Sequence, residues 1–95
     1  MTWYAYIALL ESGRFYVGII HVHPNQRALR HQAGFGGSFT RRVKISRVLW
    51  FEVHPSSMSA RKRGQQIKRW SHEKKQALIE RDFGRLKSIS RPRIR

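Results

Sequence analysis

The sequence predicts a single α+β domain in which a small three-stranded antiparallel sheet is flanked by helices. Two apolar stretches, residues 3–10 and 14–20, are separated by a short turn, and a third strand-like stretch spans 45–53. The chain after residue 55 instead shows helical spacing and capping residues. With 95 residues, of which 40% are hydrophobic, the chain can bury one modest core. We expect one domain over residues 1–90 and a basic, disordered tail over 91–95.

The first strand is aromatic or aliphatic at both alternating positions of residues 3–10, as in a strand covered on both faces. Residues 11–13, Glu-Ser-Gly, supply turn chemistry, and Arg14–Ile20 is the returning strand of a hairpin. The third strand is expected over Ile45–Val53.

Four helices are predicted, each opened by a residue that commonly starts or caps a helix. Their expected spans are Asn25–Gln32 after Pro24, with Gly34 as the stop; from Ser56 or Ser57 to about Trp70; from Ser71 to near Glu80; and from Asp82 through Ile89. The element order is therefore ββαβαα with an extra C-terminal helix.

Charge is concentrated in the later part of the chain. The sequence has 20 Lys and Arg against 5 Asp and Glu, a net charge of +15, with a pI near 11.8. Residues 1–26 carry no net charge, residues 27–54 carry +5, and residues 55–95 carry +10. So large an excess opposes compaction by self-repulsion and indicates a polyanionic partner. The neutral part is interpreted as sheet core and the basic parts as the surface presented to phosphate.

Several classes of protein are excluded by composition. Because there is no cysteine, a disulfide scaffold, a thiolate zinc site and a cysteine nucleophile are all ruled out. The longest apolar run, residues 3–10, is far shorter than the roughly 20 residues that cross a bilayer. It also lacks the basic start and small-residue cleavage site of a signal peptide, so we expect a cytoplasmic protein without a membrane partner.

The hairpin carries Tyr4-Ala5-Tyr6 on its first strand and Phe15-Tyr16-Val17-Gly18 on its second. This pair resembles the signature of the GIY-YIG nuclease superfamily. Further stretches resemble, in the same order, those of its small stand-alone bacterial members: Arg27 followed by His31, then residues 36–42, 48–52, 66–70 and 74–79. The resemblance covers residues 3–90, nearly the whole chain.

The resemblance implies a metal-dependent endonuclease that hydrolyses DNA phosphodiester bonds by in-line attack of water, with Mg²⁺ or Mn²⁺ as cofactor. It assigns Tyr6 as the general base, while Tyr16 helps to hold the water. Arg27 would neutralise charge on the scissile phosphate, and His31 would hydrogen-bond within the same site. A guanidinium suits the negative charge that gathers on the non-bridging oxygens in the transition state. A tyrosine with an ordinary pKa near 10 is a poor base at neutral pH, so Tyr6 needs a nearby cation.

The length of the hairpin loop decides whether the two tyrosines can share a site. A three-residue loop pairs Leu10 with Arg14 and Ala8 with Tyr16, which places Tyr6 on the same sheet face as Tyr16. A two-residue loop would place these tyrosines on opposite faces. We predict the three-residue loop or an equivalent bulge.

Gly64 departs from the family pattern. Aligning residues 66–70 puts Gly64 where the family carries its metal-binding glutamate, and helical spacing places it on an inward face with Ala60 and Ile67. Glycine inside a helix costs about 1 kcal/mol relative to alanine. Three interpretations are open: a natural variant, a carboxylate supplied by another residue, or a disabled nuclease, which is favoured. Since hard divalent cations require oxygen ligands, Mg²⁺ or Mn²⁺ should bind weakly.

Aromatic and basic side chains are the candidate contacts to nucleic acid. They are Phe35, Phe39, Arg41, Arg42, Arg61, Lys62, Lys68, Arg69, Lys74 and Lys75. Phe35 and Phe39 flank a glycine-rich loop beside two arginines, which suits stacking on unpaired bases, so single-stranded DNA is a candidate substrate. The alternative is that Phe39 packs under the loop.

Two other functions remain as alternatives. A non-catalytic, basic nucleic-acid-binding module would use the same surface without cutting. A small ribosomal-type protein explains the charge but not the ordered tyrosines, arginine and histidine.

His21 and His23 are expected on one strand face, where they could suggest a metal site. Because no third ligand is in sight, we interpret them as surface or phosphate-contacting residues.

Overall fold

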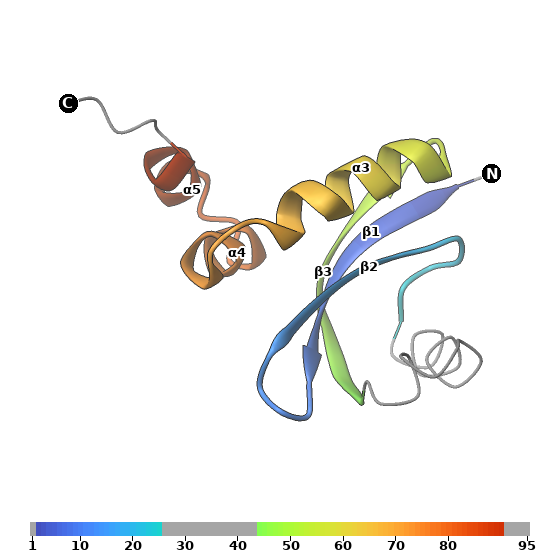
Figure 1. Cartoon of the computed structure of the whole chain (residues 1–95), viewed down its shortest axis with the longest axis horizontal. Helices are drawn as coiled ribbons and strands as arrows, with labels where there is room; N and C mark the ends of the chain where they lie inside the picture. The colour runs from blue at the N-terminus through green and yellow to red at the C-terminus, as the bar shows by residue number, and fades with distance from the viewer. Residues whose placement is uncertain (1, 26–43, 91–95) are drawn as a thin grey trace.

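A computed structural model describes residues 2–25 and 44–90 of the chain. Its three-stranded antiparallel sheet consists of β1 (Trp3–Leu10), β2 (Phe15–Ile20) and β3 (Ile45–His54), in the order β2-β1-β3 (Figure 1). This confirms the predicted sheet and the α+β class. The predicted helix over 25–32, apart from its first residue, and the tail over 91–95 lie outside the described residues.

Three helices follow β3, each close to its predicted span. They are α3 (Ser57–Lys68), α4 (His72–Ile79) and α5 (Phe83–Ser90). Each begins just after a side-chain cap: Ser56, Ser71 and Asp82 accept hydrogen bonds from the backbone N–H three residues ahead, at 3.2, 3.1 and 3.1 Å. Of the two caps predicted for α3, the structure has Ser56. The helix ends at Lys68, two residues earlier than predicted, with Arg69 as its C-cap.

β1 is the central strand, and both of its faces are buried. Ala5 and Ile7 lie on the face covered by helices, and Tyr6 and Ala8 lie on the opposite face. The helix-side cluster also takes residues from α3 and α4, and its buried members are Ala5, Ile7, Val17, Trp50, Ile67 and Leu78. The apolar character of β1 at both alternating positions therefore reflects burial on two sides.

The hairpin between β1 and β2 has the predicted three-residue loop. The Leu10 N–H donates to the Arg14 carbonyl at 2.9 Å, and the Gly13 N–H donates to the Leu10 carbonyl at 2.9 Å. Gly13 has φ +88°, a left-handed conformation that a side chain would strain. Ala8 accordingly pairs with Tyr16, as the sequence predicted.

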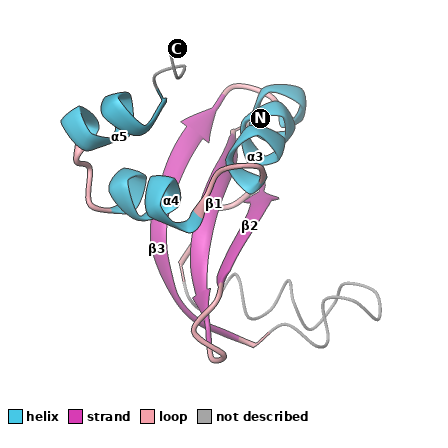
Figure 2. Ribbon diagram, turned by 60° about the vertical axis from the view of Figure 1, so that its left-hand side comes forward, coloured by secondary structure: helices cyan, strands magenta, loops and turns pink. Residues whose placement is uncertain are grey.

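α3 lies across β1 and β2 on one face of the sheet, while α4 and α5 pack against each other beyond the C-terminal end of α3 (Figure 2). Ala60, Gly64 and Ile67 are the buried residues of α3, so its inward face is the predicted one. Among the described residues, no helix has the length and apolar character needed to cross a membrane.

Candidate functional site

Tyr6 and Tyr16 lie together on the sheet face opposite α3. Their ring centroids are 6.3 Å apart, and both belong to the same cluster of side chains. Tyr6 is 3% exposed, whereas Tyr16 is half-buried. The hairpin register thus brings together the two signature tyrosines, which is the arrangement that a shared site requires.

Gly18 on β2 is paired directly with Tyr6 on β1, and it makes room for the tyrosine hydroxyl. A Cβ atom at Gly18 would lie 2.6 Å from the Tyr6 hydroxyl oxygen and 2.8 Å from its Cζ. Only glycine therefore fits under this ring. In the sequence, Gly18 stands out only as part of the signature, although a glycine inside a strand commonly marks the close approach of another group.

A hollow of about 230 Å³ lies between β2 and α3, beside Gly18. Its lining residues come from the edge strand and from the inner and flanking positions of the helix: Gly18, Ile19, Arg61, Gly64, Gln65 and Lys68. The fold therefore places Gly64 at the same hollow as Gly18, the glycine that makes room for the Tyr6 hydroxyl, although the two are 46 positions apart in the sequence.

The hollow does not fit a divalent metal ion. It is lined by two cationic side chains, Arg61 and Lys68, and by no carboxylate. In residues 2–25 and 44–90, no group of three His, Cys, Asp or Glu side chains could hold a metal. The hollow therefore presents positive charge, whereas Mg²⁺ and Mn²⁺ require negatively charged carboxylate oxygens.

No described carboxylate substitutes for a residue at position 64. Glu52 lies 3.2 Å from the Nε of Arg63 and 2.8 Å from the Nε2 of His54, which connects β3 to α3. Glu73 and Glu80 both face Arg85, at 3.2 and 3.9 Å. These three carboxylates are therefore engaged elsewhere, Asp82 caps α5, and no described carboxylate lines the hollow.

Nothing in the packing requires glycine at position 64. Its backbone is helical, and an added Cβ would lie 3.6 Å from the Ile19 Cγ2, an ordinary van der Waals contact. Among the described glycines only Gly13 has a positive φ. Position 64 can consequently carry a side chain directed toward the hollow.

The environment of Tyr6 favours its protonated form. Burial raises the pKa of Tyr6 above its ordinary value near 10, and the neighbouring Tyr16 adds to this effect. The predicted role of general base requires the opposite shift. With the described surroundings alone, the Tyr6 hydroxyl is a hydrogen-bond donor at neutral pH.

The raised pKa of Tyr6 predicts a loss of stability at alkaline pH. Above about pH 10, the unfolded chain releases this proton while the folded chain keeps it. The stabilisation is therefore complete below pH 10 and is lost as pH rises through the folded-state pKa, with a slope of up to about 1.4 kcal/mol per pH unit. We expect urea unfolding between about pH 9 and pH 11 to show this decline in the unaltered chain and a weaker one in Tyr6→Phe. Equal slopes would contradict the shift.

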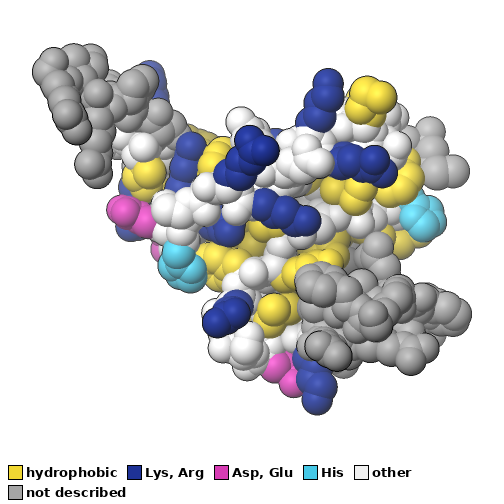
Figure 3. Space-filling view, viewed as in Figure 1, with side chains coloured by type: hydrophobic (Ala, Val, Ile, Leu, Met, Phe, Trp, Pro, Cys, Tyr) yellow, Lys and Arg dark blue, Asp and Glu magenta, His cyan; other side chains and the backbone are white. Residues whose placement is uncertain are grey.

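Cationic side chains without an acidic partner gather on the helices. Figure 3 shows Lys and Arg side chains over α3 on one side of the molecule. Six cations of α3, its C-cap and α4 form no ion pair with an acid within the described residues: Arg61, Lys62, Lys68, Arg69, Lys74 and Lys75. We call these six residues the cationic face. They coincide with the basic residues that the sequence analysis selected from this part of the chain.

The other predicted site residues lie outside the described residues. They are Arg27, His31, Phe35, Phe39, Arg41 and Arg42. Their roles stay predictions.

The prediction that His21 and His23 share a strand face is wrong. His21 contacts Trp3, with ring centroids 5.5 Å apart, whereas His23 contacts Tyr4 and Phe51 at 5.9 and 5.1 Å. Trp3 and Tyr4 are consecutive on β1 and point to opposite faces. β2 ends at Ile20, so strand alternation does not extend to these histidines.

Comparison with known proteins agrees with this geometry. The family described as the GIY-YIG catalytic domain matches residues 2–77. A UPF0213 protein of Cupriavidus pinatubonensis is 37% identical over 76 residues, which cover 80% of this chain and 83% of that protein. The solution NMR structure of a UPF0213 protein of Bacillus halodurans matches with a TM-score of 0.51 and 28% identity, over 84% of each chain. The chain belongs to the GIY-YIG catalytic domain family.

Proposed function

We propose that this chain is a DNA-binding protein of the nuclease type that hydrolyses phosphodiester bonds poorly, because position 64 lacks the carboxylate that would hold Mg²⁺ or Mn²⁺. The family implies a nuclease-like protein with a nucleic acid substrate. DNA as that substrate, a cytoplasmic location and the roles of individual residues are part of the proposal.

The observation that carries the proposal is the hollow between β2 and α3. It lies beside the glycine that accommodates the Tyr6 hydroxyl, and it has space for a side chain at Gly64, yet its charged lining is cationic. Such a lining attracts a phosphate and repels a divalent cation. In the unaltered chain the hollow therefore supports phosphate binding more than metal-assisted hydrolysis.

Within that site, the side chains have roles that need no metal. Arg61 and Lys68 would neutralise a phosphate at the hollow through charge-assisted hydrogen bonds to its oxygens. Arg27 and His31 would complete the site. These contacts bind and orient the phosphodiester.

The test compares binding and cleavage by the unaltered chain. Labelled single-stranded, duplex and branched DNA is titrated by fluorescence anisotropy at several salt concentrations, and the same substrates are incubated with Mg²⁺ or Mn²⁺. We expect binding whose log K falls linearly with log salt, with a slope approaching about −4 on single strands if all six cations of the cationic face meet phosphates. We expect no cleavage above background.

Two outcomes would contradict the proposal. Failure to bind any of the three DNA forms at low salt would remove DNA as the partner. Metal-dependent cleavage by the unaltered chain that is lost in Tyr6→Phe would show that Gly64 does not impair the site.

A further inference from the structure

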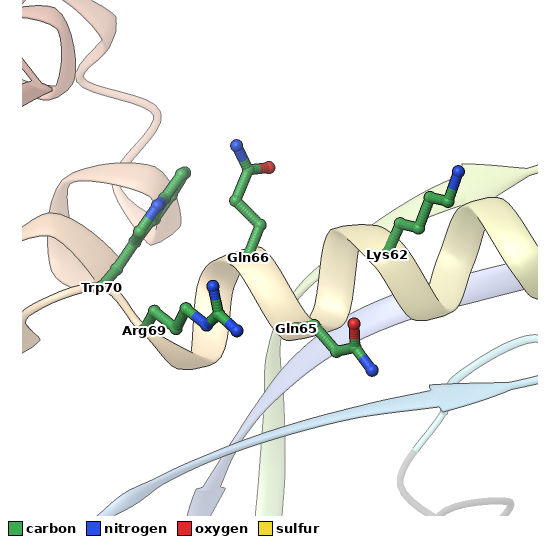
Figure 4. A pocket seen from close by; sticks show the side chains of 5 residues that line it. All are labelled: Lys62, Gln65, Gln66, Arg69 and Trp70. Atoms are coloured by element: carbon green, nitrogen blue, oxygen red, sulfur yellow. The ribbon is translucent and has the colours of Figure 1, made fainter.

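A second hollow lies along α3 and shares one lining residue, Gln65, with the first. It measures about 370 Å³, within the range of roughly 300–1,000 Å³ found for small-ligand sites. Lys62, Gln66 and Trp70 project to one side of the helix, and Gln65 and Arg69 project to the other (Figure 4). We call this the Trp70 groove.

Trp70 is an aromatic surface surrounded by cations. The indole is half-buried and packs against the helix-side core. The Nζ of Lys74 lies 4.2 Å from the ring centroid, and the guanidinium carbon of Arg63 lies 5.2 Å from it. Cations attracted to the ring face stay near the groove, where they raise the local density of positive charge.

The two glutamines supply hydrogen-bonding groups of mixed character. The Arg63 guanidinium donates to the Gln66 Oε1 at 2.6 Å, and because a guanidinium has no acceptor, the Gln66 amide nitrogen is directed elsewhere. Gln65 is also exposed, on the other side of the helix. Amide side chains both donate and accept, which suits the edge of a nucleobase better than a phosphate alone.

We propose that the Trp70 groove holds one unpaired nucleotide of a single-stranded nucleic acid. The base stacks on the Trp70 indole, the Gln66 amide contacts the base edge, and Lys62 and Arg69 bind the adjoining phosphates. This subsite rests on the proposed DNA-binding function, and its lining shares only Gln65 with the hollow at Gly64.

Charge and ring access favour an unpaired strand over other ligands. The lining has no carboxylate and two cations, so the ligand is anionic. Bases in a duplex are stacked on one another and expose no ring face to an indole, whereas single strands stack readily on aromatic side chains. Lys74 has a flexible stem, and its ammonium can move from the ring to a neighbouring phosphate when a base arrives.

A strand is favoured over a free nucleotide because the cations extend beyond the groove. Lys68, Lys74 and Lys75 belong to the same cationic face but do not line the Trp70 groove. They are available to the phosphates on either side of a bound nucleotide.

The test uses Trp70→Leu, which keeps apolar volume against the core and removes the aromatic face. On a short oligothymidylate its affinity should fall by roughly 5- to 100-fold, the range expected for one stacked base. The slope of log K against log salt should stay unchanged because no phosphate contact is lost. A hairpin duplex should bind almost as tightly as it binds the unaltered chain.

Variants at exposed residues test the groove without changing a residue that packs against the core. Arg69→Gln should lower the salt slope on oligothymidylate by about 0.7, as expected for one phosphate contact on a single strand. Gln66→Ala should weaken binding without changing the slope. Lys87→Gln removes an exposed cation of α5, away from the groove, and should leave the slope unchanged. Trp70→Phe keeps a ring and should restore most of the affinity lost in Trp70→Leu.

The outcomes separate this subsite from the proposed function. Equal losses on oligothymidylate and duplex in Trp70→Leu, or binding to single strands that no groove variant weakens, would overturn the subsite and leave DNA binding intact. Displacement of oligothymidylate by an equal concentration of free thymidine monophosphate would overturn the assignment to a strand. If the unaltered chain binds no nucleic acid, both proposals fail together.

Discussion

Replacing Gly64 by glutamate is expected to produce a chain that binds Mn²⁺ or Mg²⁺ and cleaves DNA roughly a hundredfold or more faster than the unaltered chain, since a bound metal supplies several kcal/mol of transition-state stabilisation. The added Cβ meets Ile19 at an ordinary 3.6 Å. The carboxylate would extend toward the hollow beside Gly18 and supply the oxygen ligands it lacks. The net charge falls only from +15 to +14, so DNA binding through the cationic face should persist.

Cleavage of labelled single-stranded DNA and calorimetric titration with Mn²⁺ measure this gain. Gly64→Gln is the matched control, because it has nearly the same size without the charge, and it should show neither metal binding nor cleavage. The double variant Gly64→Glu, Tyr6→Phe should bind the metal but lose the cleavage. If Gly64→Glu binds DNA and remains inactive, the chain is a nucleic-acid-binding module rather than an impaired nuclease.

Two glycine-to-alanine changes are expected to have opposite effects on stability. Gly18→Ala should lower the free energy of unfolding by about 1–3 kcal/mol, as for other overpacked sites, because its Cβ would lie within 2.6 Å of the Tyr6 hydroxyl. Gly64→Ala should raise it by up to about 1 kcal/mol, because the position is helical and has space for a Cβ.

Thermal unfolding followed by circular dichroism measures both changes. For a domain of this size, each kcal/mol corresponds to a shift of about 4–8 °C in Tm. Combining Gly18→Ala with Tyr6→Phe should recover little of the loss, since the Tyr6 Cζ would still lie 2.8 Å from the new Cβ. If both substitutions shift Tm in the same direction, the close approach of Tyr6 to Gly18 does not determine the effect of a side chain at position 18.

Much of the fold follows from local patterns in the sequence. Apolar residues at both alternating positions of 3–10 predict a central strand, and the three serine and aspartate caps place the helix starts within a residue. The turn at residues 11–13 fixes the hairpin register, because its glycine provides the left-handed conformation. Each of these features depends on interactions between residues close together in the chain.

The candidate site is only partly predictable in this way. Register and alternation suffice to place Tyr6 and Tyr16 on one face. The direction of the Tyr6 pKa shift is not predictable from sequence, because it depends on burial by residues from other elements. Strand alternation also fails at His21 and His23, since the strand ends before them.

The sequence by itself determined the family signature, the hairpin register, the helix caps and the anomaly at Gly64. Only the tertiary structure decided that Gly64 and Gly18 border one hollow, that Glu52 pairs with Arg63 and Glu73 with Arg85, and that Lys74 lies over the Trp70 ring. The physical reason is that packing α3 across the edge strand joins residues distant in the sequence. Local rules of turn, cap and alternation contain no information about that contact.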